Sequence, residues 1–221
     1  MKRTMLKVKS ILLTIVLSLV FVPGLLAQDK SEYKQAMGAA LTQMGSIKDN
    51  GGYLDLANQF QRIADNETTE WIPAYYAAFC TTLYSFGEKD KAKVDPVLDQ
   101  AQTMIDKALK LKAAESEIWV LQGMLYQARI MVDPMTRGQS FSMKANEAFQ
   151  KAESLNAENP RIYYLRGQNM MNMPKMFGGG KEAAKPMFQK ASEKFLSFKP
   201  ADMFAPNWGK EQNAQSLKSC E

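Results

Sequence analysis

The stretch AQTMIDKA at residues 101–108 recurs as ANEAFQKA at residues 145–152, an interval of 44 residues. The earlier stretch ANQFQRIA at residues 57–64 keeps the same interval, and a fourth copy, AKPMFQKA, occupies residues 184–191. Each copy begins and ends with alanine, and seven residues are about two helical turns, so both alanines face one side of a helix. The repeat therefore predicts stacked helical units that bury their apolar sides against their neighbours.

The residue between the two alanines is large, and three copies have Ile105, Phe149 and Phe188 there, whereas the first has Gln61. An aromatic residue follows the second alanine by 11 positions in three copies, at Tyr75, Trp119 and Tyr163. Glycine follows the last two of these aromatics by four positions, at Gly123 and Gly167. Small residues let two helix backbones approach closely, and the large residue fills the remaining gap. The pattern thus predicts where the helices meet.

These motifs resemble the tetratricopeptide repeat family, in which an aromatic and glycine helix precedes an Ala-x3-Phe-x2-Ala helix. The resemblance covers roughly residues 31–198 and implies an all-α fold, an α-solenoid of antiparallel helix pairs with about four units plus a C-terminal capping tail.

The family period is about 34 residues, so we assign the extra residues to long loops within the units, as in an exported bacterial type. These loops are Gly87–Asp95, Asp133–Gly138 and Met173–Gly180. After the first loop we expect a helix to begin at Asp95 and Pro96, because aspartate is a good N-cap and proline suits the first helical position.

The N-terminus reads as a cleavable secretory signal. Four basic residues precede an apolar stretch at 11–22, and the segment ends at Ala27. An uncleaved membrane anchor is the alternative, but that stretch is shorter than the roughly 18 residues that a span needs. We therefore predict a signal peptide at 1–27, a helical repeat domain at 28–199 and a tail or cap at 200–221, in a protein located in the periplasm or secreted.

Composition argues against several functions. The chain has 28 Lys and Arg against 23 Asp and Glu, and loss of the four basic residues of the signal leaves 24 against 23. A nearly neutral chain lacks the basic surface of a nucleic-acid-binding protein, and after signal cleavage we expect no membrane span. There is no histidine, which removes the commonest general base and metal ligand. With no catalytic or metal-binding motif, we expect neither an enzyme nor a cofactor.

Two cysteines, Cys80 and Cys220, leave two possibilities open. After export they could form a disulfide, or Cys80 could be a small buried residue and Cys220 a free terminal thiol.

The resemblance places a set of first-helix residues on the concave face of the solenoid. They are aromatic residues, methionines and amides, which suit an extended peptide or a hydrophobic ligand, although some could instead pack against one another. The candidate partner-binding residues are Tyr76, Tyr84, Met124, Gln127, Arg161, Tyr164, Gln168, Met171 and Asn172.

A second candidate is the loop edge, formed by Arg137, Lys175, Gly178, Gly179 and Gly180. Three glycines before a helix could cradle an anion with their backbone amides. They could equally serve only a tight turn that needs positive φ.

The first functional hypothesis is a non-catalytic, exported interaction module that binds a peptide or protein partner in its groove or at the loop edge. The alternative is a periplasmic protein that binds a small apolar ligand for a transport or envelope system. A continuous open groove would favour the first, and a cavity of a few hundred Å³ the second. Phe204 and Trp208 in the tail should dock on the repeats, either as a cap on the last helix pair or as a plug in the groove.

Overall fold

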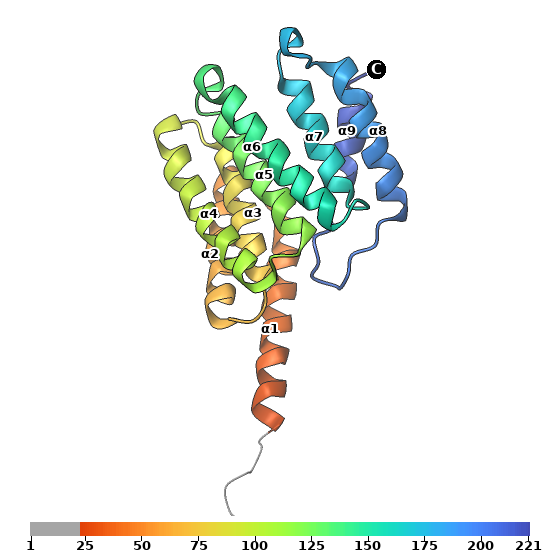
Figure 1. Cartoon of the computed structure of the whole chain (residues 1–221). Coiled ribbons are helices and arrows are strands. Elements are labelled where there is room, and N and C mark those ends of the chain that lie inside the picture. The colour runs from red at the N-terminus through yellow and green to blue at the C-terminus, as the bar shows by residue number, and fades with distance from the viewer. Residues whose placement is uncertain (1–22) are drawn as a thin grey trace, which may run out of the picture. The chain divides into compact units, whose positions relative to one another are not determined.

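The computed structural model describes residues 23–221, which form α-helices joined by short connections (Figure 1). The chain divides into two compact units, residues 1–35 and 36–221. Helix α1 (Pro23–Met44) runs across this boundary, and the packing described below lies within residues 36–221. Residues 1–22 of the predicted signal peptide lie outside the described residues, so signal cleavage stays a prediction. Over the described part of the chain, none of the helices combines the length and the hydropathy that crossing a membrane requires.

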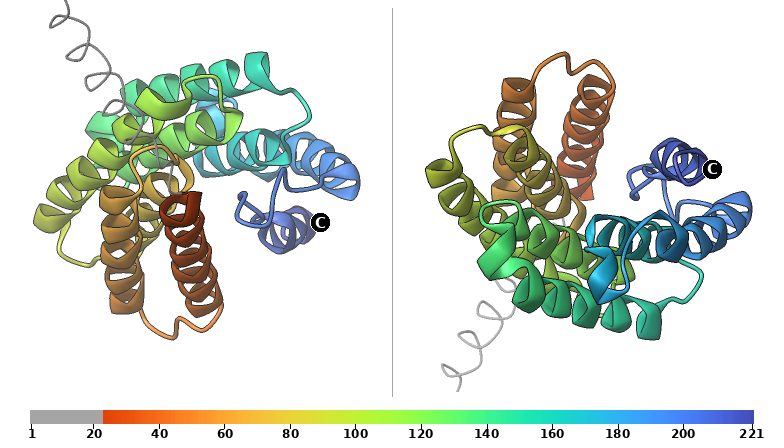
Figure 2. Two further views of the ribbon diagram at one scale, coloured as in Figure 1. Left: turned by 90° about the horizontal axis from the view of Figure 1, so that it is seen from below. Right: turned by 90° about the horizontal axis from the view of Figure 1, so that it is seen from above.

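Three helix pairs form the body of the second unit, and α2 (Asn50–Asn66) precedes them. The pairs are α3 (Ile72–Gly87) with α4 (Lys91–Lys112), α5 (Ser116–Ile130) with α6 (Pro134–Leu155), and α7 (Pro160–Asn172) with α8 (Lys181–Ser197). The first helices of successive pairs also touch, because α5 contacts both α3 and α7. The end-on views in Figure 2 show α4 and α6 on the outer side of these first helices. The all-α prediction of paired, repeat-like helices is confirmed.

The paired alanines lie at the helix contacts, as the repeat predicts. All eight are buried. The two glycines fit the large residues of the same units, because a Cβ at Gly123 would lie 2.2 Å from Cε1 of Phe149 and one at Gly167 would lie 2.5 Å from Cε1 of Phe188. The two halves of the motif therefore pack against each other within a helix pair, and any side chain larger than hydrogen would collide there.

Two of the three predicted long loops are wrong, because the helices begin earlier than expected. Helix α4 starts at Lys91, where the side chain of Asp90 accepts a hydrogen bond from the Ala92 amide, and Pro96 lies inside the helix. A proline this close to the start removes a single backbone hydrogen bond, so the earlier cap sets the boundary. Helix α6 begins at Pro134, capped by Asp133. The extra residues of these two units therefore lengthen α4 and α6 to 22 residues each.

The third loop is a true connection between α7 and α8. It contains a short 3-10 turn, η1 (Lys175–Phe177), and then Gly178 and Gly180 with φ of 84° and 107°. A side chain is strained in this left-handed region, so the glycines serve the turn.

The tail docks on the repeats, as predicted. Phe204 is buried and Trp208 is half-buried. Helix α9 (Lys210–Lys218) packs against α8, and Nδ2 of Asn213 donates to the Phe188 carbonyl (3.0 Å) and to Oγ of Ser192 (2.8 Å). Cys80 is buried and both cysteines are free, so the structure holds no disulfide between Cys80 and Cys220.

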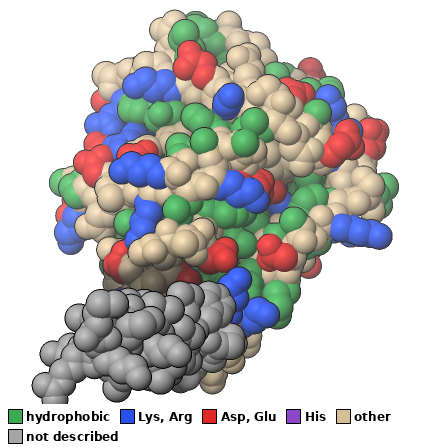
Figure 3. All heavy atoms as spheres, turned by 60° about the horizontal axis from the view of Figure 1, so that its bottom comes forward, with side chains coloured by type: hydrophobic (Ala, Val, Ile, Leu, Met, Phe, Trp, Pro, Cys, Tyr) green, Lys and Arg blue, Asp and Glu red, His purple; other side chains and the backbone are tan. Residues whose placement is uncertain are grey.

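Charges of both signs are interspersed on the face drawn in Figure 3, with hydrophobic side chains between them. Neither sign forms a continuous patch on this face, in keeping with the nearly neutral composition.

Candidate functional site

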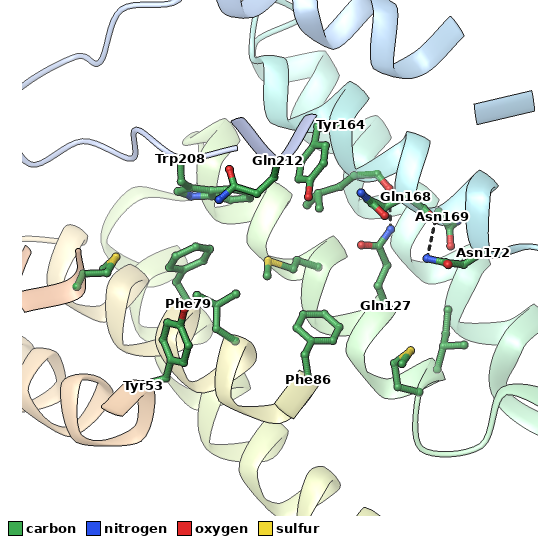
Figure 4. A pocket seen from close by; sticks show the side chains of 16 residues that line it. Tyr53, Phe79, Phe86, Gln127, Tyr164, Gln168, Asn169, Asn172, Trp208 and Gln212 are labelled. Carbon is green, nitrogen blue, oxygen red and sulfur yellow. Dashed lines mark hydrogen bonds between the residues drawn. The ribbon is translucent and has the colours of Figure 1, made fainter. Parts of the chain in front are cut away.

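A cavity of about 510 Å³ lies on the side of α3, α5 and α7 that faces the C-terminal segment (Figure 4). Its walls also include residues from the end of α1, from α2 and from α9. The lining residues are Met44, Tyr53, Phe79, Leu83, Phe86, Met124, Gln127, Ile130, Met131, Tyr164, Leu165, Gln168, Asn169, Asn172, Trp208 and Gln212. None of these described residues is charged, so the cavity suits a ligand that is largely apolar.

Aromatic rings form one end of the cavity. The indole of Trp208 stacks on Phe79 with ring centroids 4.9 Å apart and an interplanar angle of 27°. The ring of Tyr164 lies 6.5 Å from the indole at 74°, in an edge-to-face arrangement. Nε1 of Trp208 donates a hydrogen bond to the hydroxyl of Tyr75 (2.8 Å). These contacts fix a rigid aromatic surface.

Amide side chains gather on one side of the cavity, where Gln127, Gln168, Asn169 and Asn172 lie together in Figure 4, while Gln212 lies beside Trp208. Nε2 of Gln127 donates to the Leu165 carbonyl (2.7 Å), and Nε2 of Gln168 donates to Oγ of Ser216 (2.7 Å). Nδ2 of Asn172 donates to the Gln168 carbonyl (3.0 Å). The bonds hold the amides in place, so the cavity offers a polar side without a formal charge.

The cavity provides few groups that could bind a metal. The sequence has no histidine, and no three His, Cys, Asp or Glu side chains are grouped for a metal ion among the described residues. The candidate donors on the lining are the phenols of Tyr53 and Tyr164 and the thioethers of three methionines. Burial raises the pKa of Tyr164, partly offset by a hydrogen bond with Gln168, so the phenol stays protonated at neutral pH. Cys80 lies outside the lining, and burial raises its pKa to about 12.

Five of the nine candidate groove residues come together in this cavity: Met124, Gln127, Tyr164, Gln168 and Asn172. They lie on α5 and α7, where the helical spacing of the repeat motif gives the correct face. Whether they bind a partner stays a prediction.

The other four candidates lie elsewhere. Tyr76 is buried and stacks on Phe60 with centroids 5.1 Å apart. Tyr84 donates its hydroxyl proton to Oε2 of Glu88 (2.7 Å). Met171 is half-buried and does not line the cavity. Tyr76 thus packs against a neighbouring helix, which was the alternative for part of the set.

Arg161 is also a core residue, because its side chain is fully buried. Its Nε and Nη2 donate to the two carboxylate oxygens of Glu117 at 2.8 and 2.6 Å. Burial lowers the pKa of Arg161, but the charge and hydrogen bonds of Glu117 outweigh this and raise it. The guanidinium is therefore charged and cannot meet a ligand in the groove.

Arg137 and the three glycines of the loop edge form an ion pair or hydrogen bonds within the protein. Arg137 pairs through Nη2 with Oδ2 of Asp95 (2.7 Å), which links α6 to α4. The amides of Gly178, Gly179 and Gly180 donate to the carbonyls of Lys175, Pro174 and Met170. Because these donors are used by the turn, an anion would depend on the first amides of α8, and anion binding at this edge stays a prediction.

Sequence reasoning found Tyr164 but missed the other aromatic residue that Trp208 contacts in the cavity, Phe79. Phe79 occupies the position that is glycine in the other two pairs, four residues after Tyr75, and this break in the repeat is the signal that marks it. Trp208 was expected to dock, but its partner Phe79 is far away in the sequence. Nothing in the repeat pattern connects the two.

A second hollow of about 350 Å³ lies between α4, α5 and α6. Its lining is mixed in charge and includes Asp106, Lys144 and Glu147. Two amides of the lining, Gln102 and Gln122, donate to each other at 2.8 Å in both directions. This hollow is smaller and more polar than the first cavity.

No family model and no curated protein matches the chain, so the resemblance to the tetratricopeptide repeat family stays a prediction. A solved structure, the HusA haemophore from Porphyromonas gingivalis, is similar to this chain with 32% sequence identity and a TM-score of 0.77. The similarity covers 86% of this chain and 92% of that chain.

Proposed function

The chain belongs to the same family as the HusA haemophore, and from this premise we propose that it is an exported binding protein that carries haem in the cavity between α3, α5, α7 and Trp208. The observation that carries the proposal is the cavity itself. Its volume of about 510 Å³ falls within the range of about 300–1,000 Å³ usual for small-molecule sites, and its lining is aromatic, methionine-rich and uncharged.

The residues fit the chemistry of haem, which is a flat apolar ring system with two carboxylate groups at one edge. The rings of Trp208, Tyr164 and Phe86 offer apolar contact to the flat surface. The amides of Gln127 and Gln168 offer hydrogen bonds to polar groups of the ligand.

Few side chains at the cavity could ligate the haem iron. Proteins hold haem iron through His, Cys, Met or Tyr. Histidine is absent and Cys80 is outside the cavity, so only tyrosine and methionine could ligate. The raised pKa of Tyr164 disfavours its phenolate form. The proposal therefore assigns most of the binding free energy to burial of the ring system in the cavity.

The alternative from the sequence, a small apolar ligand, is thus better supported than a peptide or protein partner. A cavity of this size accommodates one compact ligand, and the family includes a haemophore. We also propose that the protein is exported and acts by binding and not as an enzyme, in line with its similarity to a haemophore.

A titration of the purified protein with haemin tests the proposal. We expect saturable binding, seen as a shift of the haem absorption band and as quenching of tryptophan fluorescence. Binding that never saturates, or a spectrum equal to that of free haemin, would overturn it.

Two matched variants test the location of the site. Phe86 lines the cavity and is 41% exposed, whereas Leu196 on α8 is 82% exposed and lies away from it. Phe86→Asp removes apolar contact and places a charged carboxylate against the apolar ring system, so haemin affinity should fall about tenfold. Leu196→Asp makes the same change from an apolar to a charged side chain at the surface and should leave affinity unchanged. Equal affinities for both variants would place the ligand elsewhere.

A further inference from the structure

The cavity is completed by a segment that is not part of any helix pair. Residues 199–209, here called the strap, connect α8 to α9 and bring Trp208 against Phe79. Within the strap, Phe204, Pro206 and Gly209 are buried. The strap thus has one side in the core and one residue, Trp208, on the cavity lining.

Arg161 of α7 holds the backbone of the strap. Its Nη2 donates to the Pro206 carbonyl at 2.8 Å, and its Nη1 donates to the Trp208 carbonyl at 2.9 Å. The guanidinium also lies 4.4 Å from the ring centroid of Phe198, just before the strap. Because Glu117 of α5 accepts the other donors of the same guanidinium, one side chain ties α5, α7 and the strap together.

Only arginine has this arrangement of donors. Its planar group presents five N–H bonds in a fixed fork, whereas lysine is a point charge that cannot span a carboxylate and two carbonyls at once. A buried ion pair gives little net stability compared with apolar packing of the same volume. The geometry therefore points to a role in setting the position of the strap.

The side chain of Trp208 is held by contacts of its own, in addition to those of its backbone. Nε1 donates to the Tyr75 hydroxyl, and the ring stacks on Phe79. Gly209 follows directly with φ of 99°, and a Cβ there would lie 3.1 Å from Cζ of Phe195. The chain can make this turn close to the core only with glycine, so backbone and ring are held independently.

We propose that Arg161 and Glu117 are positioning residues that hold Trp208 as the aromatic surface against which the ligand stacks, and so set ligand affinity without touching the ligand. This inference rests on the proposed function. It adds that the strap, and not the repeats alone, makes the cavity a binding site.

Haemin titrations of four variants test the inference. Trp208→Ala removes the aromatic surface and should weaken haemin binding about ten- to a hundredfold, whereas Trp208→Phe keeps a ring and should restore most of the affinity. Trp119→Phe is the control, since Trp119 lies at the second hollow, and it should bind as the parent does. The double variant Glu117→Leu with Arg161→Met removes both buried charges together and should fold, yet bind haemin about as weakly as Trp208→Ala.

The effect of Trp208→Ala, measured in the parent and in the double variant, distinguishes a positioning role of Arg161 from a merely structural one. If Arg161 acts through Trp208, adding Trp208→Ala to the double variant should weaken binding little further. Fully additive losses, or a double variant that binds as the parent does, would contradict the positioning role. If the double variant does not fold, the pair of Trp208 variants decides, and equal affinity of Trp208→Ala and the parent overturns the inference. A parent that fails to bind haemin refutes the proposed function instead.

Discussion

Two kinds of contact hold segments of this chain together. One joins the two helices of a pair by apolar packing, and the other joins the strap to α5 and α7 by polar bonds. In the pairs, small residues such as Gly123 let backbones approach, and Phe149 fills the space. At the strap, a buried Arg161 binds a carboxylate and two backbone carbonyls. The glycine and phenylalanine contact recurs in successive helix pairs, whereas the Arg161 contact joins only the strap to α5 and α7. The repeats supply a scaffold, and the polar contacts of Arg161 position the strap that lines the cavity.

Breaking the polar contact should have the largest effect. Arg161→Ala leaves Glu117 buried without its partner, and such a loss costs about 3–5 kcal/mol. We expect a large decrease in the free energy of unfolding measured by urea denaturation. Arg166→Ala is the control, because its pair with Glu153 is partly exposed and pairs of this kind contribute about 1 kcal/mol or less. Similar losses for both variants would show that the buried contact is not special.

Overpacking a helix contact should have an intermediate effect. Gly123→Ala would place a methyl group 2.2 Å from Phe149, which costs about 1–3 kcal/mol. Gly138→Ala is the matched control, because this glycine lies within α6 and, apart from its chain neighbours and the adjacent backbone of α6, no atom lies within 4 Å of the point that an alanine methyl group would occupy there. That control should stabilise the protein by about 0.5–1 kcal/mol, since alanine favours the helix. Thermal melts that move in the same direction for both variants would contradict the packing described here.

The smallest effect concerns a surface ion pair between the outer helices. The hydrogen bond from Arg137 lowers the pKa of Asp95, burial opposes this, and Arg129 adds to the lowering. A carboxyl whose folded pKa is lowered contributes stability that is full above its unfolded pKa, about 4, and is lost as pH falls through the folded pKa. Asp95→Asn should therefore lower stability slightly at neutral pH and reduce the loss of stability that the parent shows as pH falls below about 4. A variant with an unchanged acid denaturation curve would exclude this contribution.

The repeat made the helix pairs predictable from the sequence. Contacts that do not recur with the repeat could not be predicted in this way. The alanines and the groove residues on α5 and α7 follow from helical spacing. Arg161 and Tyr76 were misplaced because spacing gives a face of a helix and cannot say whether another segment covers that face. Glu117 is 44 residues from Arg161, and Tyr75 is 133 residues from Trp208, so no local pattern connects them.

The loop errors have a different cause. Asp90 and Asp95 are both acceptable caps, and a helix that begins after the earlier one also includes the buried Val94. Local residue preference cannot weigh tertiary burial, so the boundary was placed too late.

A crystal structure of the protein with haem bound tests the central claim most directly. We predict that the ring system lies in the cavity between α3, α5 and α7, in contact with Trp208, while Arg161 keeps its hydrogen bonds to the Pro206 and Trp208 carbonyls. Haem found in the second hollow beside Trp119, or bound at the surface without contact to Trp208, would contradict the account.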